Sequence, residues 1–262
     1  MATDNLATSQ FPDPLARTAS KVPAVTAGFW LIKILATTLG ETGGDAVSMS
    51  MGLGYLAGTA IFLVVFAVTV HAQIRAPKFH PELYWSTIIA STTVGTTLAD
   101  YADRSLGMGY AGGGASLLGL VVASLLAWRW KLGSIDVTTV ATPQTEGFYW
   151  LTIMASQTLG TALGDWTADS VGLGYAGAAL IFSGLLLLVV LAWRHTRIPR
   201  PALFWAAFVL TRPLGAVVGD FLDKPLDHGG LALSRYAASL CLLAAIAILI
   251  RLLPQRAALR TH

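Results

Sequence analysis

TTLGETGGD (residues 37–45), TTVGTTLAD (92–100), QTLGTALGD (157–165) and RPLGAVVGD (212–220) are four versions of one segment. Each begins seven residues after a tryptophan and ends at an aspartate, and a glycine follows nine residues later. The tryptophan–aspartate–glycine sets are Trp30, Asp45 and Gly54; Trp85, Asp100 and Gly109; Trp150, Asp165 and Gly174; and Trp205, Asp220 and Gly229. Such internal repetition indicates that one structural unit occurs four times.

The composition is that of a membrane protein. Hydrophobic residues make up 55% of the chain, charged residues 12%, and the mean hydropathy is +0.64, whereas a soluble domain carries about 25% charged residues. A long apolar run follows each repeated segment, at residues 56–70, 115–128, 176–193 and 236–250. Each run extends to roughly 20 residues, the length of a helix that crosses the hydrocarbon core.

The sequence therefore predicts two helices in each repeat. The apolar runs form the second helix, which we call helix B. The first, helix A, is richer in Thr, Gly and Ala, which are typical of helix contacts in lipid. We expect the A helices at residues 25–45, 82–100, 146–165 and 202–220. The predicted fold is an all-α integral membrane protein with eight transmembrane helices.

The spacing of the tryptophans indicates two halves. The steps are 55, 65 and 55 residues, so a linker at 131–146 separates repeats one and two (21–130) from repeats three and four (147–253). We expect a disordered tail at 1–20 and a basic tail at 254–262. Because each repeat holds an even number of helices, all four point the same way. This predicts parallel repeats about an axis along the membrane normal, with A helices inside and B helices outside.

Basic residues predict the orientation. The N-terminal tail and the segments that follow the B helices hold 12 of the 17 Lys and Arg residues. By the positive-inside rule, both termini are cytoplasmic and the A-to-B turns face outward. We expect a multi-pass protein of the bacterial cytoplasmic (inner) membrane. The turns and adjoining A-helix ends hold nine of the fourteen acids, so the outer end is expected to be negative.

The shared residues of helix A lie on one face, within an arc of about 160° at 3.6 residues per turn. Polar groups within a bilayer must face protein or water, so this face is expected to line the centre of the bundle. In repeat one the stripe consists of Trp30, Thr37, Thr38, Gly40, Glu41, Gly44 and Asp45.

The W-x₆-[TQ]-T-[LV]-G-[ET]-x₃-D pattern and the following G-[LM]-G-Y carry a resemblance to a known family. The chain resembles bacterial membrane-anchored proteins with four tandem repeats of unknown function, each with two transmembrane segments and a characteristic tryptophan. The resemblance covers about residues 22–253. Repeat four departs from it at Arg212, Pro213 and 227–230. The resemblance implies an architecture but no activity.

The four aspartates have two interpretations. An aspartate at a helix C-terminus opposes the helix dipole at a cost of about 0.3–1 kcal/mol, and four such costs on the inward face favour an acidic vestibule that concentrates a cation. The alternative is contact with headgroup water or with the adjoining turn.

Three charged residues lie deeper. Glu41 is one turn below Asp45, and Arg212 lies at the depth of Thr37 in the repeat that neighbours repeat one in a ring. Because a charge within the membrane is costly unless paired or wet, we expect a Glu41–Arg212 salt bridge, either a structural lock or an exchange site. Lys33 lies about 12 Å below Glu41 and is expected to hold a carbonyl or reach the inner interface.

The remaining motif residues have structural interpretations. The tryptophans are expected to be packing residues or anchors at the cytoplasmic interface. Pro213 leaves the Val209 carbonyl without its helix partner. Either the proline only kinks the helix for packing, or the freed carbonyl serves as a ligand. The shared glycines are expected to allow close helix crossing; they are Gly40, Gly95, Gly160 and Gly215.

Motifs of soluble enzymes are absent from the sequence: it has no phosphate loop, zinc-protease motif or nucleophile elbow. No histidine pair has metal-ligand spacing. We therefore predict no enzyme activity, no cofactor, no structural metal and no nucleic-acid partner; the expected partners are the lipid bilayer and a small ion. Cys241, the single cysteine, excludes an intramolecular disulfide. The sequence leaves the oligomeric state open.

The sequence favours a secondary transporter or exporter of a small hard cation, because the polar stripe offers oxygen ligands. It leaves open the ion, the direction, the driving gradient and channel versus carrier. Alternatives are a non-transporting scaffold or assembly protein and an anion or small-solute carrier centred on Arg212. The residues expected to line the pathway are Glu41, Asp45, Asp100, Asp165, Asp220, Thr37, Thr92, Gln157, Lys33 and Arg212, with Glu41 and Asp45 as possible ion ligands.

Overall fold

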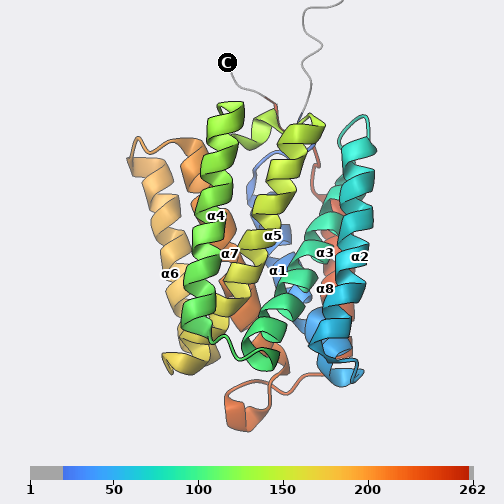
Figure 1. The fold of residues 1–262 in the computed structure, drawn as a ribbon, viewed down its shortest axis with the longest axis vertical. Coiled ribbons are helices and arrows are strands. Elements are labelled where there is room, and N and C mark those ends of the chain that lie inside the picture. The colour runs from blue at the N-terminus through green and yellow to red at the C-terminus, as the bar shows by residue number, and fades with distance from the viewer. Residues whose placement is uncertain (1–19, 260–262) are drawn as a thin grey trace, which may run out of the picture.

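The computed structural model describes residues 20–259 (Figure 1). Within them the fold is all-helical, apart from one isolated β-bridge between Pro23 and Ala257. The eight-helix prediction is confirmed for this part of the chain, whereas the tail expected at 1–20 lies, except for Ser20, outside the described residues. The long helices are α1 (Ala27–Asp45), α2 (Gly54–Arg75), α3 (Pro81–Asp100), α4 (Tyr110–Leu132), α5 (Pro143–Asp165), α6 (Gly174–His195), α7 (Arg200–Asp223) and α8 (Arg235–Leu252).

The helix starts follow from local sequence. Thr26 caps α1 by accepting from the Phe29 N–H, and Thr142 forms a capping box with Thr145 at the start of α5. Proline occupies the first turn of α3, α5 and α7, where its missing N–H costs nothing.

The sequence predicts that the A helices end at the repeated aspartates, but they continue beyond them. α1, α3 and α5 each continue as one π-helical turn of five residues: η1 (Ala46–Ser50), η2 (Tyr101–Ser105) and η4 (Trp166–Ser170). α7 instead continues as α-helix to Asp223 and is followed by the 3₁₀ turn η5 (Leu226–His228). The free carbonyls therefore lie beyond the aspartates, which weakens the helix-dipole argument for them. The closing glycines have positive φ, as at Gly54 (79°) and Gly229 (80°), a conformation that glycine adopts without strain.

The four A helices form a closed ring. α1 packs against α3 and α7, and α5 packs against the same two helices from the other side. Each B helix packs mainly on the A helix of the following repeat: α2 on α3, α4 on α5, α6 on α7, and α8 back on α1 (Figure 1). The A helices thus lie inside and the B helices outside.

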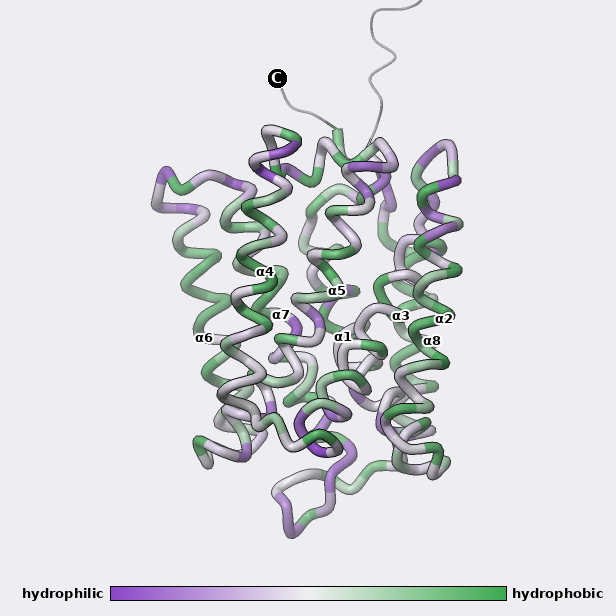
Figure 2. The backbone as a smooth tube through the Cα atoms, viewed as in Figure 1, coloured by the Kyte–Doolittle hydropathy of each residue, from purple (hydrophilic) through white to green (hydrophobic). Residues whose placement is uncertain are grey.

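Hydropathy separates the two sets. α2, α4, α6, α8 and the inner helix α7 are long and apolar enough to cross a membrane. α2, α4, α6 and α8 expose most of their residues, whereas α7 is largely buried. Figure 2 shows the outer helices as mainly hydrophobic. α1, α3 and α5 contain more Thr and Gly, which lowers their hydropathy.

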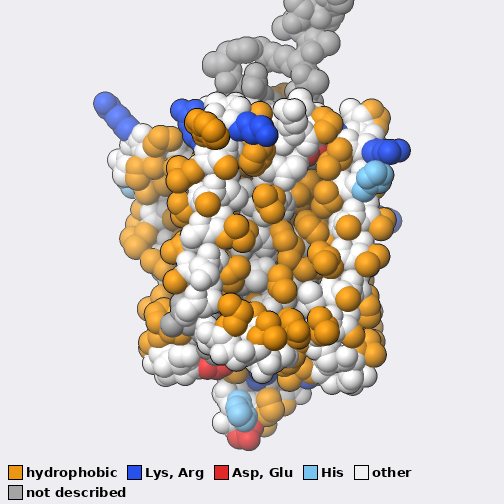
Figure 3. All heavy atoms as spheres, in the orientation of Figure 1, with side chains coloured by type: hydrophobic (Ala, Val, Ile, Leu, Met, Phe, Trp, Pro, Cys, Tyr) orange, Lys and Arg blue, Asp and Glu red, His pale blue; other side chains and the backbone are white. Residues whose placement is uncertain are grey.

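The two ends of the bundle differ. The first and last described segments, residues 20–24 and 256–258, lie at one end, which we call the terminal end. The A-to-B turns lie at the other, the turn end (Figure 1). Lys and Arg side chains gather at the terminal end in the face shown by Figure 3, and acidic side chains are visible at the turn end.

Two terminal segments close the terminal end. Residues 20–24 and 256–258, which we call the terminal cap, are joined by Ala24 N–H to Arg256 O (2.7 Å) and Ala258 N–H to Val22 O (2.8 Å). The side chain of Lys21, within this cap, donates from Nζ to Glu146 Oε1 of α5 at 2.6 Å, and both side chains are buried. Part of the predicted 254–262 tail is therefore packed against the bundle. The linker carries one further turn, η3 (Val137–Thr139).

Candidate functional site in the ring of A helices

The interior of the ring consists of five layers of side chains. The layers recur every four residues, at positions −1, +3, +7, +11 and +15 from each tryptophan. From the terminal end they are Phe29, Tyr84, Tyr149 and Phe204; Lys33, Ile88, Ile153 and Phe208; Thr37, Thr92, Gln157 and Arg212; Glu41, Thr96, Thr161 and Ala216; and Asp45, Asp100, Asp165 and Asp220. All are buried, and they change from aromatic to acidic along the axis.

Glycines bring neighbouring helices into contact at the third layer. Each +10 glycine touches the +7 residue of the next repeat, and a Cβ there would overlap it or come within 2.8 Å. Gln157, for example, lies against Gly95 and donates from Nε2 to Ser91 Oγ at 3.4 Å. This geometry supports the close-crossing role. The pairs are Gly40–Thr92, Gly95–Gln157, Gly160–Arg212 and Gly215–Thr37.

Arg212 connects all four repeats. Its Nη2 donates to Glu41 Oε2 of repeat one at 3.0 Å, to Thr96 Oγ1 of repeat two at 2.5 Å and to Thr161 Oγ1 of repeat three. Thr96 Oγ1 also lies 3.2 Å from Glu41 Oε2. The expected Glu41–Arg212 ion pair is present, and both side chains are buried. Nε and Nη1 of Arg212 have no hydrogen-bond partner among the described residues.

Lys33 lies one layer nearer the terminal end. Its Nζ is 4.2 Å from the centroid of the Phe208 ring, and within residues 20–259 it has no hydrogen-bond partner. The expectation that Lys33 holds a carbonyl is therefore wrong. Its layer is otherwise formed by Ile88, Ile153 and Phe208.

The four repeated aspartates are buried, with exposed fractions of 1–3%. The expected water-facing vestibule is thus closed in this structure, because basic residues from the turns lie between the carboxylates. Lys224 Nζ is 2.7 Å from Asp45 Oδ2 and 3.0 Å from Asp220 Oδ1.

A second basic residue, Arg104, bridges the aspartates of repeats two and three. Arg104 Nε is 2.8 Å from Asp100 Oδ1, and its Nη2 is 3.7 Å from Asp165 Oδ2.

Burial lowers the pKa of Lys224, but Asp220, Asp45 and Asp223 raise it by more, so the net shift is upward.

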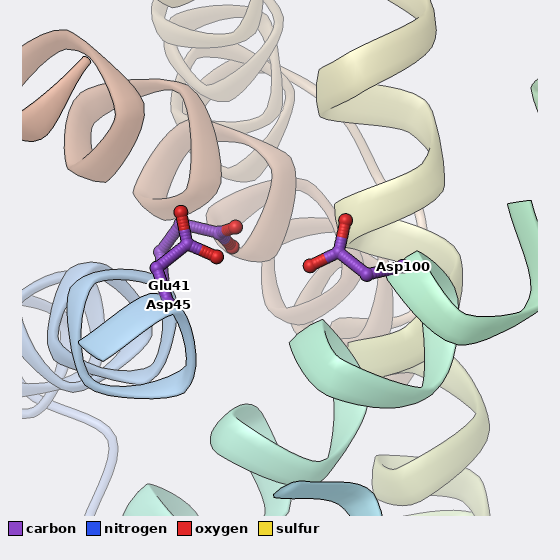
Figure 4. A group of neighbouring side chains, drawn as sticks. All are labelled: Glu41, Asp45 and Asp100. Atoms are coloured by element: carbon purple, nitrogen blue, oxygen red, sulfur yellow. The ribbon is translucent and has the colours of Figure 1, made fainter. Parts of the chain in front are cut away.

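Two groups of carboxylate oxygens have metal-ligand proximity. One oxygen each from Glu41, Asp45 and Asp100 lies within 4.8 Å of the others, and Figure 4 shows Asp100 pointing across the ring toward the other two. Asp45, Asp220 and Asp223 form a second such group. Carboxylate oxygens suit hard cations such as Mg²⁺, Ca²⁺ and Mn²⁺.

Several of these residues were not anticipated from the sequence. Asp223 pairs with Arg235, whose Nε lies 2.7 Å from Asp223 Oδ2. Arg104 and Lys224 each follow a repeated aspartate by four residues, and this i,i+4 spacing was the available signal. At the same position repeats one and three have Met49 and Asp169.

The tryptophans are packing residues. Trp85, Trp150 and Trp205 are at most 3% exposed, so the interface-anchor interpretation is wrong for these three. Trp85 Nε1 donates to Gln255 Oε1 at 3.1 Å and Trp205 Nε1 to Ile135 O at 3.0 Å. Trp30 is partly buried and packs against the rings of Phe29 and Phe204.

Pro213 lies inside α7 without interrupting it. Its Cδ would be 3.0 Å from a Cβ at Gly160, so the ring of the proline contributes to the close contact between α5 and α7.

The comparisons with known proteins agree with the fourfold division. The repeat described as "Repeat of Unknown Function (DUF347)" matches at residues 28–79, 83–133, 148–198 and 203–253. No curated protein and no solved structure gives a significant match.

Proposed function

This chain belongs to the DUF347 repeat family, and we propose that it is a membrane transport protein for a small hard cation. The polar interior of the A-helix ring is the proposed pathway. The supporting observation is the buried Arg212–Glu41 pair, which connects directly to the carboxylate layer.

In this proposal all eight helices span the membrane, with the ring axis along the membrane normal and the terminal end in the bacterial cytoplasm. The exposed apolar faces of the B helices support contact with lipid. The gathering of Lys and Arg at the terminal end supports the orientation. The inner helices α1, α3 and α5 are shielded from lipid by the B helices and need not be equally apolar.

The charges at the turn end support a cation as substrate. Six buried acidic side chains gather there, against four basic ones. The acids are Glu41, Asp45, Asp100, Asp165, Asp220 and Asp223, and the bases are Arg104, Arg212, Lys224 and Arg235. Buried charge is costly in a bilayer unless it is paired, so a cation that enters this cluster balances the surplus of acids.

The proposed mechanism is an exchange of partners. Glu41 bonds Arg212 in the closed state and contributes an oxygen to the Glu41–Asp45–Asp100 group when a cation enters. Arg212 then remains bonded to Thr96 and Thr161. The arginine returns to Glu41 when the cation leaves, which empties the site. Access from the terminal end requires movement of the aromatic layer and of the terminal cap.

Flux measurements test the proposal. Purified protein in liposomes is assayed with Na⁺, K⁺, Mg²⁺ and Mn²⁺, beside empty liposomes. We expect flux of at least one cation, which Glu41→Gln abolishes; Gln keeps an oxygen for Arg212 and Thr96. Glu82→Gln, an exposed acid on the terminal side, is the matched control and retains flux. Size-exclusion profiles show that both variants are folded.

Flux equal to that of empty liposomes for every ion would overturn the proposal and support a non-transporting scaffold. A second candidate, an anion carrier, is favoured by one observation: Lys33 Nζ and Arg212 Nε and Nη1 are buried without acceptors among the described residues. Chloride or carboxylate flux that survives Glu41→Gln but not Arg212→Gln would support that candidate instead.

A further inference from the structure

We propose that Asp45, Asp220 and Asp223 form a divalent-cation site that the protein blocks with its own Lys224 ammonium. A metal ion and Lys224 therefore compete for the same carboxylates. The effect of this competition on ion flux rests on the proposed transport function, but the existence of the site does not.

The ammonium lies where a bound ion would lie. Lys224 Nζ is 2.7 Å from Asp45 Oδ2 and 3.0 Å from Asp220 Oδ1, and the three carboxylates each place an oxygen within 4.8 Å of the others. Two oxygens on opposite sides of a Ca²⁺ ion are about 4.6–5.2 Å apart. The existing spacing therefore suits an ion of that size with little rearrangement.

The third carboxylate has unused ligand capacity. Asp223 Oδ2 accepts from Arg235 Nε at 2.7 Å, but Oδ1 has no hydrogen-bond partner among residues 20–259, and the side chain is fully buried. An unpaired carboxylate oxygen is costly at such a position. A divalent ion would satisfy it, whereas the ammonium of Lys224 donates to Asp45 and leaves Oδ1 unbonded.

The backbone fixes the attachment point of Lys224. This residue directly follows α7, and the loop after it folds back through Ala232 N–H to Lys224 O (2.9 Å) and Leu231 N–H to Phe221 O (2.8 Å). Movement of the flexible four-carbon side chain alone releases Asp45 and Asp220 from Lys224. Arg235 stays at the edge of the site, with its Nε 2.7 Å from Asp223 Oδ2 and its Nη2 3.7 Å from Asp45 Oδ2. Because the competitor is attached to the site, its effective concentration is high, of the order of millimolar or above.

The site is specific to the seam between repeats four and one. Only repeats two and four carry a basic residue four positions after the aspartate, Arg104 and Lys224. Arg104 bridges Asp100 and Asp165. Asp103, which corresponds in position to Asp223, does not complete a group with them among the described residues.

Equilibrium binding tests the proposal. Ca²⁺ is titrated into the purified full-length protein in detergent by calorimetry, and the thermal midpoint is measured with and without Ca²⁺. We expect Lys224→Met to bind Ca²⁺ at least about tenfold more tightly than the wild type and to gain the larger thermal shift. Adding Asp223→Asn to Lys224→Met should remove this gain. Lys78→Met, an exposed lysine at the terminal end, is the control and should behave as wild type.

Lys224→Gln, which keeps a polar side chain beside Asp45 and Asp220, replaces the Met variant if the latter does not fold. Equal Ca²⁺ affinity in the wild type and the folded Lys224 variant would overturn the proposal. Tight binding that persists with Asp223→Asn would also overturn it. These results are independent of flux: a protein with this binding pattern but no transport would refute only the proposed function.

Discussion

Arg212 of α7 and Glu41 of α1 join the last repeat to the first, with Nη2 3.0 Å from Oε2. Arg212 is fully buried and Glu41 is 3% exposed. The pair therefore contributes to closing the ring of A helices, in addition to any role in exchange.

Removing one member of this pair should destabilise the protein. Arg212→Met leaves a buried carboxylate without its cation, and we expect a loss of about 3–5 kcal/mol, the range for broken buried pairs. The double variant Arg212→Met, Glu41→Leu should recover much of the loss, because no charge remains. Denaturant unfolding in detergent micelles measures both. A single variant as stable as the double would contradict a closing role for the pair.

The +10 glycines should not tolerate even alanine. A Cβ at Gly95 would lie 2.8 Å from Gln157 Cβ and from the Gln157 carbonyl carbon, so Gly95→Ala must push α3 and α5 apart. We expect a loss of about 1–3 kcal/mol. Gly119→Ala and Gly184→Ala are matched controls, because nothing lies within 4 Å of a Cβ there; alanine should stabilise those helices by up to about 1 kcal/mol. Thermal midpoints distinguish the two classes.

Replacing Lys33 should stabilise the protein. Its ammonium is buried against Phe208 without a hydrogen-bond acceptor among the described residues, and a buried charge without such a partner is costly. Lys33→Met keeps a similar volume in a layer of Ile and Phe, so we expect a higher thermal midpoint. If flux falls in the same variant, the lysine is retained for function at the expense of stability. A lower midpoint would show that Lys33 contributes to stability.

The sequence could predict the eight helices and the inner position of the A helices because both follow from repetition and hydropathy. It could also predict the Glu41–Arg212 contact, since depth along a helix is fixed by residue count. It could not predict that each B helix packs on the next repeat, because the repeated pattern is equally compatible with packing inside its own hairpin. The closure of the carboxylate layer by Arg104 and Lys224 depends on side-chain direction beyond the helix ends. The π-helical turns, which have no clear signal in composition, move the helix ends past the aspartates.

The terminal cap should open if the pathway reaches the terminal end. Pro23 and Ala257 form an antiparallel bridge, a separation that suits a disulfide. In a Cys241→Ala background, Pro23→Cys with Ala257→Cys should crosslink on oxidation and block flux, and a reductant should restore it. Each single-cysteine variant is the control. Undiminished flux in the fully crosslinked protein would show that the cap does not need to move.

The Lys224 bridge should persist through neutral and mildly alkaline pH. Burial lowers the pKa of Lys224, but its three aspartate neighbours raise it by more. The contribution of the Lys224 bridge to folding stability is therefore complete below the pKa of lysine in the unfolded chain, about 10.4. It is lost only as pH rises through the higher pKa of Lys224 in the folded protein. Between about pH 7 and pH 9 the wild type should lose no stability through deprotonation of Lys224, so its stability advantage over Lys224→Met should not shrink. A difference that shrinks over this interval, measured by denaturant unfolding, would contradict the upward shift.

The packing of every outer helix on its successor has a consequence for biosynthesis. As the chain leaves the ribosome, α2 is made before α3, the helix on which it packs, and α1 waits for α8, the last helix to be made. Because each outer helix packs mainly on the next repeat, the packing of the bundle is incomplete until the last helix is made. A nascent protein that lacks its final hairpin would present Glu41 without Arg212, a buried carboxylate without its cation.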